Sequence, residues 1–133
     1  MNEAPFNHTD GGRTASGLSG EQLDCTVRAF AIARGVPYIE AHAELSRLGR
    51  LPGKGFKFRV VAQKRPDLFT RQYLPKGERR RVRTLLRTLP PGRHVLRIHR
   101  HVFAVVDGIV HDDCSSLDAL KNRIVTDIFT AVP

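Results

Sequence analysis

The chain has 133 residues, of which 41% are hydrophobic, and its formal net charge is +9. This length accommodates one domain with its own core, and no apolar run reaches the roughly 20 residues that cross a bilayer. Residues 1–20 lack the regions of a secretory signal, and two cysteines do not make a disulfide framework. We therefore expect a cytoplasmic protein with reduced thiols and no membrane association. The basic charge favours an acidic partner.

Residues 1–19 are rich in Gly, Ser, Thr and Asn, which predicts a flexible N-terminal tail. The remainder, residues 20–133, contains no internal repeat and is predicted to fold as a single domain. Helical patterns come first in this domain and antiparallel strands later. This order is typical of the α+β class.

Two helices are predicted at the start of the domain. Asp24 and Gly35 are residue types that cap the two ends of a helix, here covering about residues 25–34. Because this helix is apolar nearly all round, we expect it inside the protein. Pro37 suits the first turn of the second helix. The apolar stripe of that helix consists of Tyr38, Ala41, Leu45 and Leu48.

The middle of the chain is less regular. Residues 49–55 are predicted to form a loop that contains Gly and Pro. The pattern of residues 56–69 does not decide between helix and strand, although Pro66 must interrupt or end any helix there. Strands are predicted at about residues 70–74, 94–100 and 123–132.

Residues 78–89 show the clearest amphipathic pattern. Apolar side chains recur at helical spacing, at Val82, Leu85, Leu86 and Leu89. Five arginines surround that stripe: Arg79, Arg80, Arg81, Arg83 and Arg87. Such a surface is usually just solvated, but this density of arginine also favours an anionic partner such as nucleic acid. No aromatic residues are interleaved, so base stacking is not indicated.

A β-hairpin is predicted around Asp107-Gly108, a dipeptide typical of the type I′ turn. A two-residue turn there fixes the pairing of the flanking strands. Counting outward from the turn places four side chains on one face of the hairpin: His101, Phe103, Asp112 and Cys114. His111 and Asp113 then lie on the other face.

Cys25 and His101 have the local settings that nucleophilic catalysis needs. Cys25 falls where the first helix begins, and both a helix N-terminus and a nearby imidazolium stabilise the reactive thiolate. Asp112 is the diagonal neighbour of His101 across the hairpin, about 7–8 Å away by Cα. A β-bulge would exchange Asp112 for Asp113. We expect Cys25 as nucleophile, His101 as base and Asp112 as the carboxylate that orients the imidazole, with no metal or other cofactor.

Two motifs carry a family resemblance. They are Asp24-Cys25-x-x-Arg28-Ala29-x-Ala31 followed by Gly35, and His101-x-x-Ala104-Val105-Val106-Asp107-Gly108 followed by Asp112. With them the chain resembles the papain-like cysteine peptidase superfamily over about residues 20–115. The likeness is closer to small phage- and bacteria-encoded members than to bacteriocin-processing peptidases.

The resemblance implies a central helix that carries the nucleophile and packs on an antiparallel sheet that carries the histidine. It also implies a peptidase or isopeptidase that acts on a peptide or protein through a thioester, although transamidation and acyl transfer use the same triad. Gln22 is an oxyanion candidate beside the Cys25 N–H, but stands closer to the cysteine than the family's glutamine. Arg100 stands directly before His101, where relatives in the family usually have glycine. Its larger side chain is expected to narrow access to the active site. Cys114 is a candidate redox partner that would switch activity off if it formed a disulfide with Cys25.

Other interpretations stay open. The main alternative is a basic binding module that holds nucleic acid or an acidic protein and has a degenerate site. A zinc module would use the spacings of His99, His101, His111 and Cys114, although the predicted hairpin turns His111 away from His101. Taken alone, Cys25 is more often a small buried hydrophobe.

Overall fold

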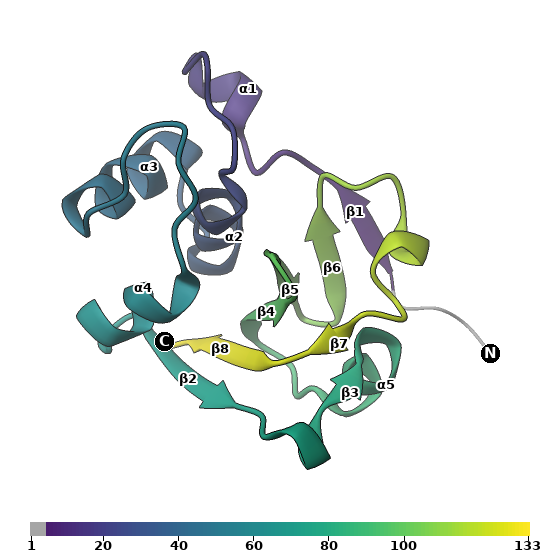
Figure 1. Ribbon diagram of the computed structural model, residues 1–133. Helices are drawn as coiled ribbons and strands as arrows, with labels where there is room; N and C mark the ends of the chain where they lie inside the picture. The colour runs from purple at the N-terminus through teal and green to yellow at the C-terminus, as the bar shows by residue number, and fades with distance from the viewer. Residues whose placement is uncertain (1–4) are drawn as a thin grey trace.

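The computed structural model describes residues 5–133, so residues 1–4 of the predicted tail lie outside the described part. A six-stranded sheet forms the centre, with helices on both faces (Figure 1). The spatial order of its strands is β1 (Phe6–His8), β6 (Ile109–Asp112), β5 (His101–Val106), β4 (Arg93–Ile98), β8 (Asp127–Ala131) and β2 (Phe69–Tyr73). β1 runs parallel to β6, and the other neighbours are antiparallel. The fold is α+β, as predicted.

Five α-helices lie within the described residues. They are α1 (Arg13–Ser16), α2 (Cys25–Arg34), α3 (Tyr38–Arg47), α4 (Phe58–Lys64) and α5 (Val82–Thr88). Short 3₁₀ turns occur at Lys76–Glu78 and Leu117–Ala119, and β3 (Arg80–Arg81) pairs with β7 (Ile124–Val125) in a second small sheet. α2 and α4 pack on one face of the central sheet, with α3 packed against α2, and α5 and β7 pack on the other face. None of the described helices is long and apolar enough to cross a bilayer.

α2 begins and ends where the sequence predicts. Gly35 ends it with φ 66°, a left-handed conformation that glycine adopts without strain, and its N–H bonds to carbonyls of the last turn. Asp24 precedes the helix, but its side chain makes no capping hydrogen bond. The Asp24 carboxylate is buried and accepts hydrogen bonds from Arg28 and Tyr38 instead. The second helix, α3, buries its predicted stripe of Tyr38, Ala41, Leu45 and Leu48.

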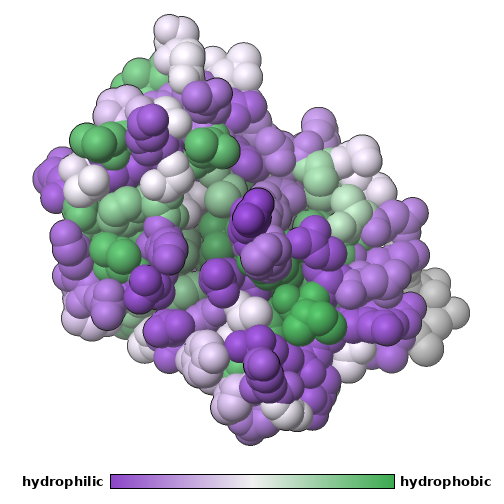
Figure 2. Space-filling model, viewed as in Figure 1, coloured by the Kyte–Doolittle hydropathy of each residue, from purple (hydrophilic) through white to green (hydrophobic). Residues whose placement is uncertain are grey.

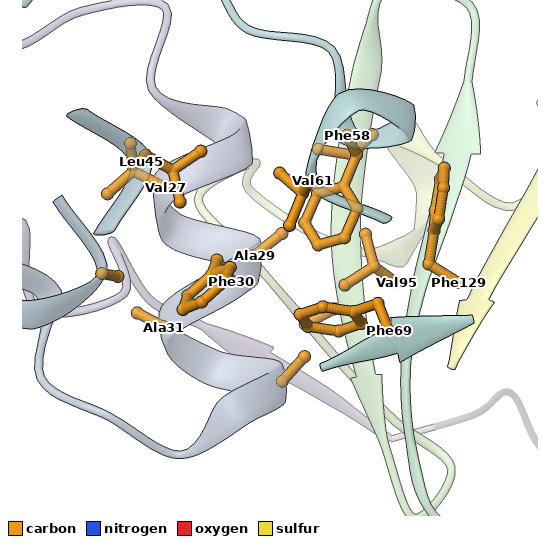
Figure 3. Packing of buried hydrophobic residues seen from close by; sticks show 14 of the residues in the cluster. Val27, Ala29, Phe30, Ala31, Leu45, Phe58, Val61, Phe69, Val95 and Phe129 are labelled. Carbon is orange, nitrogen blue, oxygen red and sulfur yellow. The ribbon is translucent and has the colours of Figure 1, made fainter. Parts of the chain in front are cut away.

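Aromatic side chains lock the helices onto the sheet (Figure 3). Phe58 of α4 packs edge-on against Phe69, with ring centroids 4.9 Å apart, and lies 4.8 Å from Phe129. Val27 and Phe30 of α2 belong to the same buried cluster. Removing one such ring typically costs about 3–5 kcal/mol. This core fixes α2, and with it Cys25, relative to the strands.

The predicted hairpin and its register are confirmed. Val106 pairs with Ile109 and Ala104 pairs with His111, so no bulge interrupts this part of the ladder. Asp107 and Gly108 have φ values of 48° and 81°, the positive angles that a type I′ turn requires. Asp112 therefore keeps its predicted place near the open end of the hairpin.

The structure differs from the predicted flexible tail over residues 5–19. β1 extends the sheet along β6, and the Thr9 N–H donates to the backbone carbonyl of Asp112 at 2.9 Å. The Asp10 carboxylate accepts backbone N–H groups at the start of α1. Composition misses this order because the contacts of β1 are made with a strand far along the chain.

The helix predicted at residues 78–89 is shorter in the structure. Arg80 and Arg81 form β3, and α5 begins only at Val82. The ladder with β7 takes the backbone groups that another helical turn would use. The five arginines therefore do not share one helix face. The strand predicted at residues 123–132 is likewise divided between β7 and β8, which belong to different sheets.

Candidate active site

Cys25 is the first residue of α2 and is half-buried. The N–H of a residue at this position has no acceptor within its own helix, and the helix dipole places partial positive charge there. α2 packs against β5, the strand that begins with His101. The start of α2 at Cys25 and the packing of this helix against β5 together place the thiol in the same pocket as the imidazole.

His101 is positioned by a tight connection between β4 and β5. Ile98 pairs with His101, so only His99 and Arg100 make the turn, and Arg100 adopts φ 61°. The His101 ring stacks on Phe103, with centroids 6.1 Å apart. Its Nε2 lies 2.8 Å from Asp112 Oδ2. The carboxylate thus fixes the ring orientation and leaves Nδ1 for another partner.

Cys25 lies beside this ring in the same pocket, and hydrogen bonding with the His101 side chain and the backbone N–H of Val102 acts on the pKa of its thiol. Burial raises the pKa of the Cys25 thiol, but these two hydrogen bonds and the charges of His101 and Arg28 outweigh burial and lower the pKa from its ordinary value. Burial lowers the pKa of His101, whereas Asp112 and Cys25 raise it, and the net result is about 9. Both shifts favour a thiolate beside an imidazolium.

Asp112 is 3% exposed and held from several sides. Burial raises its pKa, but the hydrogen bond and charge of His101 and hydrogen bonds from Cys114 and the Asp113 backbone lower it overall. Arg28 Nη1 lies 3.4 Å from Asp112 Oδ1 and 3.0 Å from Asp113 Oδ1. Asp112 is therefore the carboxylate that meets His101, and Asp113 is an exposed neighbour of Arg28.

Arg28 and Tyr38 hold the buried carboxylate of Asp24, the residue that precedes Cys25. Neither residue was assigned a role from the sequence. Arg28 Nε lies 3.1 Å from Asp24 Oδ1, and the Tyr38 hydroxyl donates to Asp24 Oδ2 at 2.9 Å. Arg13 adds a third contact to Asp24, at 3.1 Å. The signal was present in the sequence, because Arg28 stands four residues after Asp24 in an otherwise apolar helix and a buried arginine needs carboxylate partners.

A pocket of about 380 Å³ opens beside Cys25 and His101. Leu23, Phe56, Phe58 and Val102 supply apolar surface, and Lys57, Arg97, His99 and Arg100 supply basic or imidazole groups. In Figure 2 a hollow with a green floor separates the helical side, at the left, from strongly hydrophilic side chains near the centre of the view.

Two predicted site residues, Gln22 and Cys114, do not line the pocket at Cys25. Gln22 is exposed and lines a separate pocket of about 580 Å³ with Arg13 and Asp24, so its side chain is not brought to the Cys25 pocket. Cys114 is free, and its Sγ lies 3.4 Å from Ser116 O. Burial and the Asp112 carboxylate raise the pKa of Cys114 to about 11, which keeps this thiol protonated and unreactive.

Two alternative sites from the sequence, a zinc site and an arginine surface for an anionic partner, can be compared with the structure. Within residues 5–133 no group of three or more His, Cys, Asp or Glu side chains could hold a metal ion. His111 Nδ1 accepts a hydrogen bond from Asn7 at 3.0 Å, away from His101. Of the arginine surface, Arg79 is held by Leu74 O and the Tyr73 ring, whereas four of its members are exposed: Arg80, Arg81, Arg83 and Arg87.

The chain matches no family model, no curated protein and no solved structure. The residues and geometry of this site are therefore the basis on which a function can be proposed.

Proposed function

We propose that this protein is a papain-like cysteine hydrolase that cleaves peptide or isopeptide bonds with Cys25, His101 and Asp112. The observation that carries the proposal is the position of His101, whose Nε2 lies 2.8 Å from Asp112 Oδ2 and whose ring lines one pocket with Cys25. A half-buried nucleophile, a base and an orienting carboxylate in this order are the arrangement that covalent hydrolysis uses.

The reaction follows from the protonation states that the site favours. The Cys25 thiolate attacks the substrate carbonyl, and the Cys25 N–H at the start of α2 donates to the oxyanion. The His101 imidazolium gives its proton to the leaving amine as the C–N bond breaks, which leaves a thioester and neutral His101. His101 then takes a proton from water, whose oxygen attacks the thioester. The acid leaves, and thiolate and imidazolium are restored.

Asp112 does not exchange protons in this scheme. Its hydrogen bond to Nε2 directs Nδ1 toward Cys25, and its charge stabilises the imidazolium. Arg28 in turn fixes the carboxylate. Gln22 has no role in the proposed oxyanion hole, because its side chain lines another pocket.

A quenched-fluorescent peptide library tests the proposal. Wild-type protein is expected to cleave members of the library, and a peptidyl vinyl sulfone is expected to label Cys25, as read by mass spectrometry. Cys25→Ala and His101→Ala should both abolish cleavage while circular dichroism shows that the fold is retained. A fully active Cys25→Ala variant would contradict the proposal.

The second candidate function is a basic binding module, which the exposed Arg80, Arg81, Arg83 and Arg87 favour. It predicts DNA or RNA binding that weakens steeply with salt. It also predicts that this binding is unchanged in Cys25→Ala. Absence of binding at low salt would exclude it.

A further inference from the structure

We infer that the groove beside Cys25 selects substrates that carry an acidic side chain close to the scissile bond. This inference rests on the proposed hydrolase function and names its substrate class. Its basis is a second pocket, of about 290 Å³, that shares Lys57, Phe58 and Arg97 with the pocket at Cys25. The shared wall makes the two pockets neighbouring parts of one groove.

The groove is strongly basic. Five cationic side chains line its two pockets: Lys57, Arg59, Arg71, Arg97 and Arg100. The only carboxylate in either lining is Asp127, which is 1% exposed. Its two oxygens already contact Arg71 at 2.7 Å and Arg97 at 3.5 Å. The groove therefore keeps a clear excess of positive charge.

Three of these cations have no hydrogen bond or ion pair within residues 5–133. They are Lys57, Arg59 and Arg100, and all three side chains are exposed. Lys57 and Arg100 line the pocket that contains Cys25 itself. Unpaired cations around an apolar floor made by Phe56 and Phe58 are complementary to a carboxylate carried on a peptide.

The position of the charge distinguishes this groove from the general basic character of the chain. Arg80 and Arg83 lie on β3 and α5 and line neither pocket. They supply a matched control, because reversing their charge changes the net charge of the protein by the same amount without altering the groove.

The first experiment compares alkylation of Cys25 by iodoacetate, which is anionic, and by iodoacetamide, which is neutral. In both reactions the thiolate displaces iodide and forms an S–C bond. We expect the rate ratio of iodoacetate to iodoacetamide at Cys25 to exceed the ratio for glutathione. It should fall by about threefold or more in Lys57→Glu/Arg100→Glu, most clearly at low salt. It should stay unchanged in Arg80→Glu/Arg83→Glu.

The second experiment measures kcat/KM for quenched-fluorescent peptides that carry Glu, Gln or Lys at each position in turn. Glu is expected to be preferred at one or more positions, and Lys57→Glu/Arg100→Glu should remove that preference. Cleavage that ignores the difference between Glu and Lys would overturn the inference and leave the hydrolase intact. If no peptide is cleaved but the alkylation ratio behaves as expected, the hydrolase fails and the anion-binding groove stands. Slower Cys25 alkylation in the presence of duplex DNA, but not of Glu-containing peptides, would assign the groove to nucleic acid instead.

Discussion

The Arg28 guanidinium reaches Asp112, with Nη1 3.4 Å from Oδ1. The contact joins α2, which carries Cys25, to β6, which carries the carboxylate that orients His101. Arg28 is only 8% exposed and also meets Asp24. One buried cation thus links the two halves of the candidate site.

Removal of the Arg28 guanidinium is expected to lower the free energy of unfolding. Arg28→Met leaves Asp24 and Asp112 buried without their shared partner, and breaking a buried pair in this way typically costs about 3–5 kcal/mol of the free energy of unfolding. Urea unfolding measures the loss. Arg47→Met on α3 is the control, because its pair with Glu44 is exposed and worth about 0–1 kcal/mol.

Arg28→Lys separates positioning from folding. The lysine keeps the charge but cannot span the carboxylates as the guanidinium does. We expect kcat to fall, with the alkylation pKa of Cys25 shifting upward, while the fold is retained. An unchanged pKa and unchanged kcat would limit Arg28 to a structural role.

The pH dependence follows from the two shifted groups. The thiolate–imidazolium pair exists above the lowered pKa of Cys25 and below the His101 pKa of about 9. Activity should therefore form a bell whose alkaline limb lies near pH 9. Asp112→Asn should move that limb toward lower pH, because the carboxylate raises the His101 pKa. An alkaline limb that Asp112→Asn leaves in place would contradict the assignment.

The same shift affects stability. Because the folded-state pKa of His101 is raised from 6.5 to about 9, protonated His101 stabilises the fold fully below about pH 6.5. This contribution is lost as the pH rises through about 9. The difference in unfolding free energy between wild type and His101→Ala should shrink over that interval in urea titrations. A difference that stays constant with pH would count against the pair.

Removal of the first eight residues tests the order of the N-terminal segment. The truncation deletes β1 and its ladder with β6, but retains Thr9, whose N–H bonds to Asp112 O. Each hydrogen bond of the lost ladder contributes about 1 kcal/mol net. We therefore expect the truncation to lower the free energy of unfolding by about 2 kcal/mol, and to lower kcat. Asn7→Ala, which removes one exposed side-chain contact, should cost less. If the truncated protein has wild-type stability, the segment contributes nothing to the fold, as expected of a flexible tail.

Local signals in the sequence predict the parts of the site that depend on short-range rules. Asp107-Gly108 determines the hairpin register, and the register places Asp112 beside His101. Asp24 and Gly35 mark the two ends of α2, and Cys25 is the first residue of this helix. These features depend on backbone conformations and strand periodicity that a few neighbouring residues determine.

Long-range contacts explain what the sequence does not predict. β1 is a strand because it pairs with the edge of β6, a contact that its own sequence does not reveal. β3 replaces the start of the helix predicted at residues 78–89 because it pairs with β7. Asp24 has a typical N-cap identity, yet Arg28 and Tyr38 draw its carboxylate into the interior. In each case a tertiary partner outweighs a local propensity.

The most direct test of the central claim is the rate of Cys25 alkylation by iodoacetamide as a function of pH, with Cys114 as the internal reference. We expect Cys25 to react rapidly well below the ordinary thiol pKa of about 8.5. Cys114, whose pKa is raised to about 11, should react slowly in the same sample. Loss of the rapid reaction in His101→Ala would establish the thiolate–imidazolium pair. A Cys25 that titrates as an ordinary thiol, with or without His101, would contradict the account.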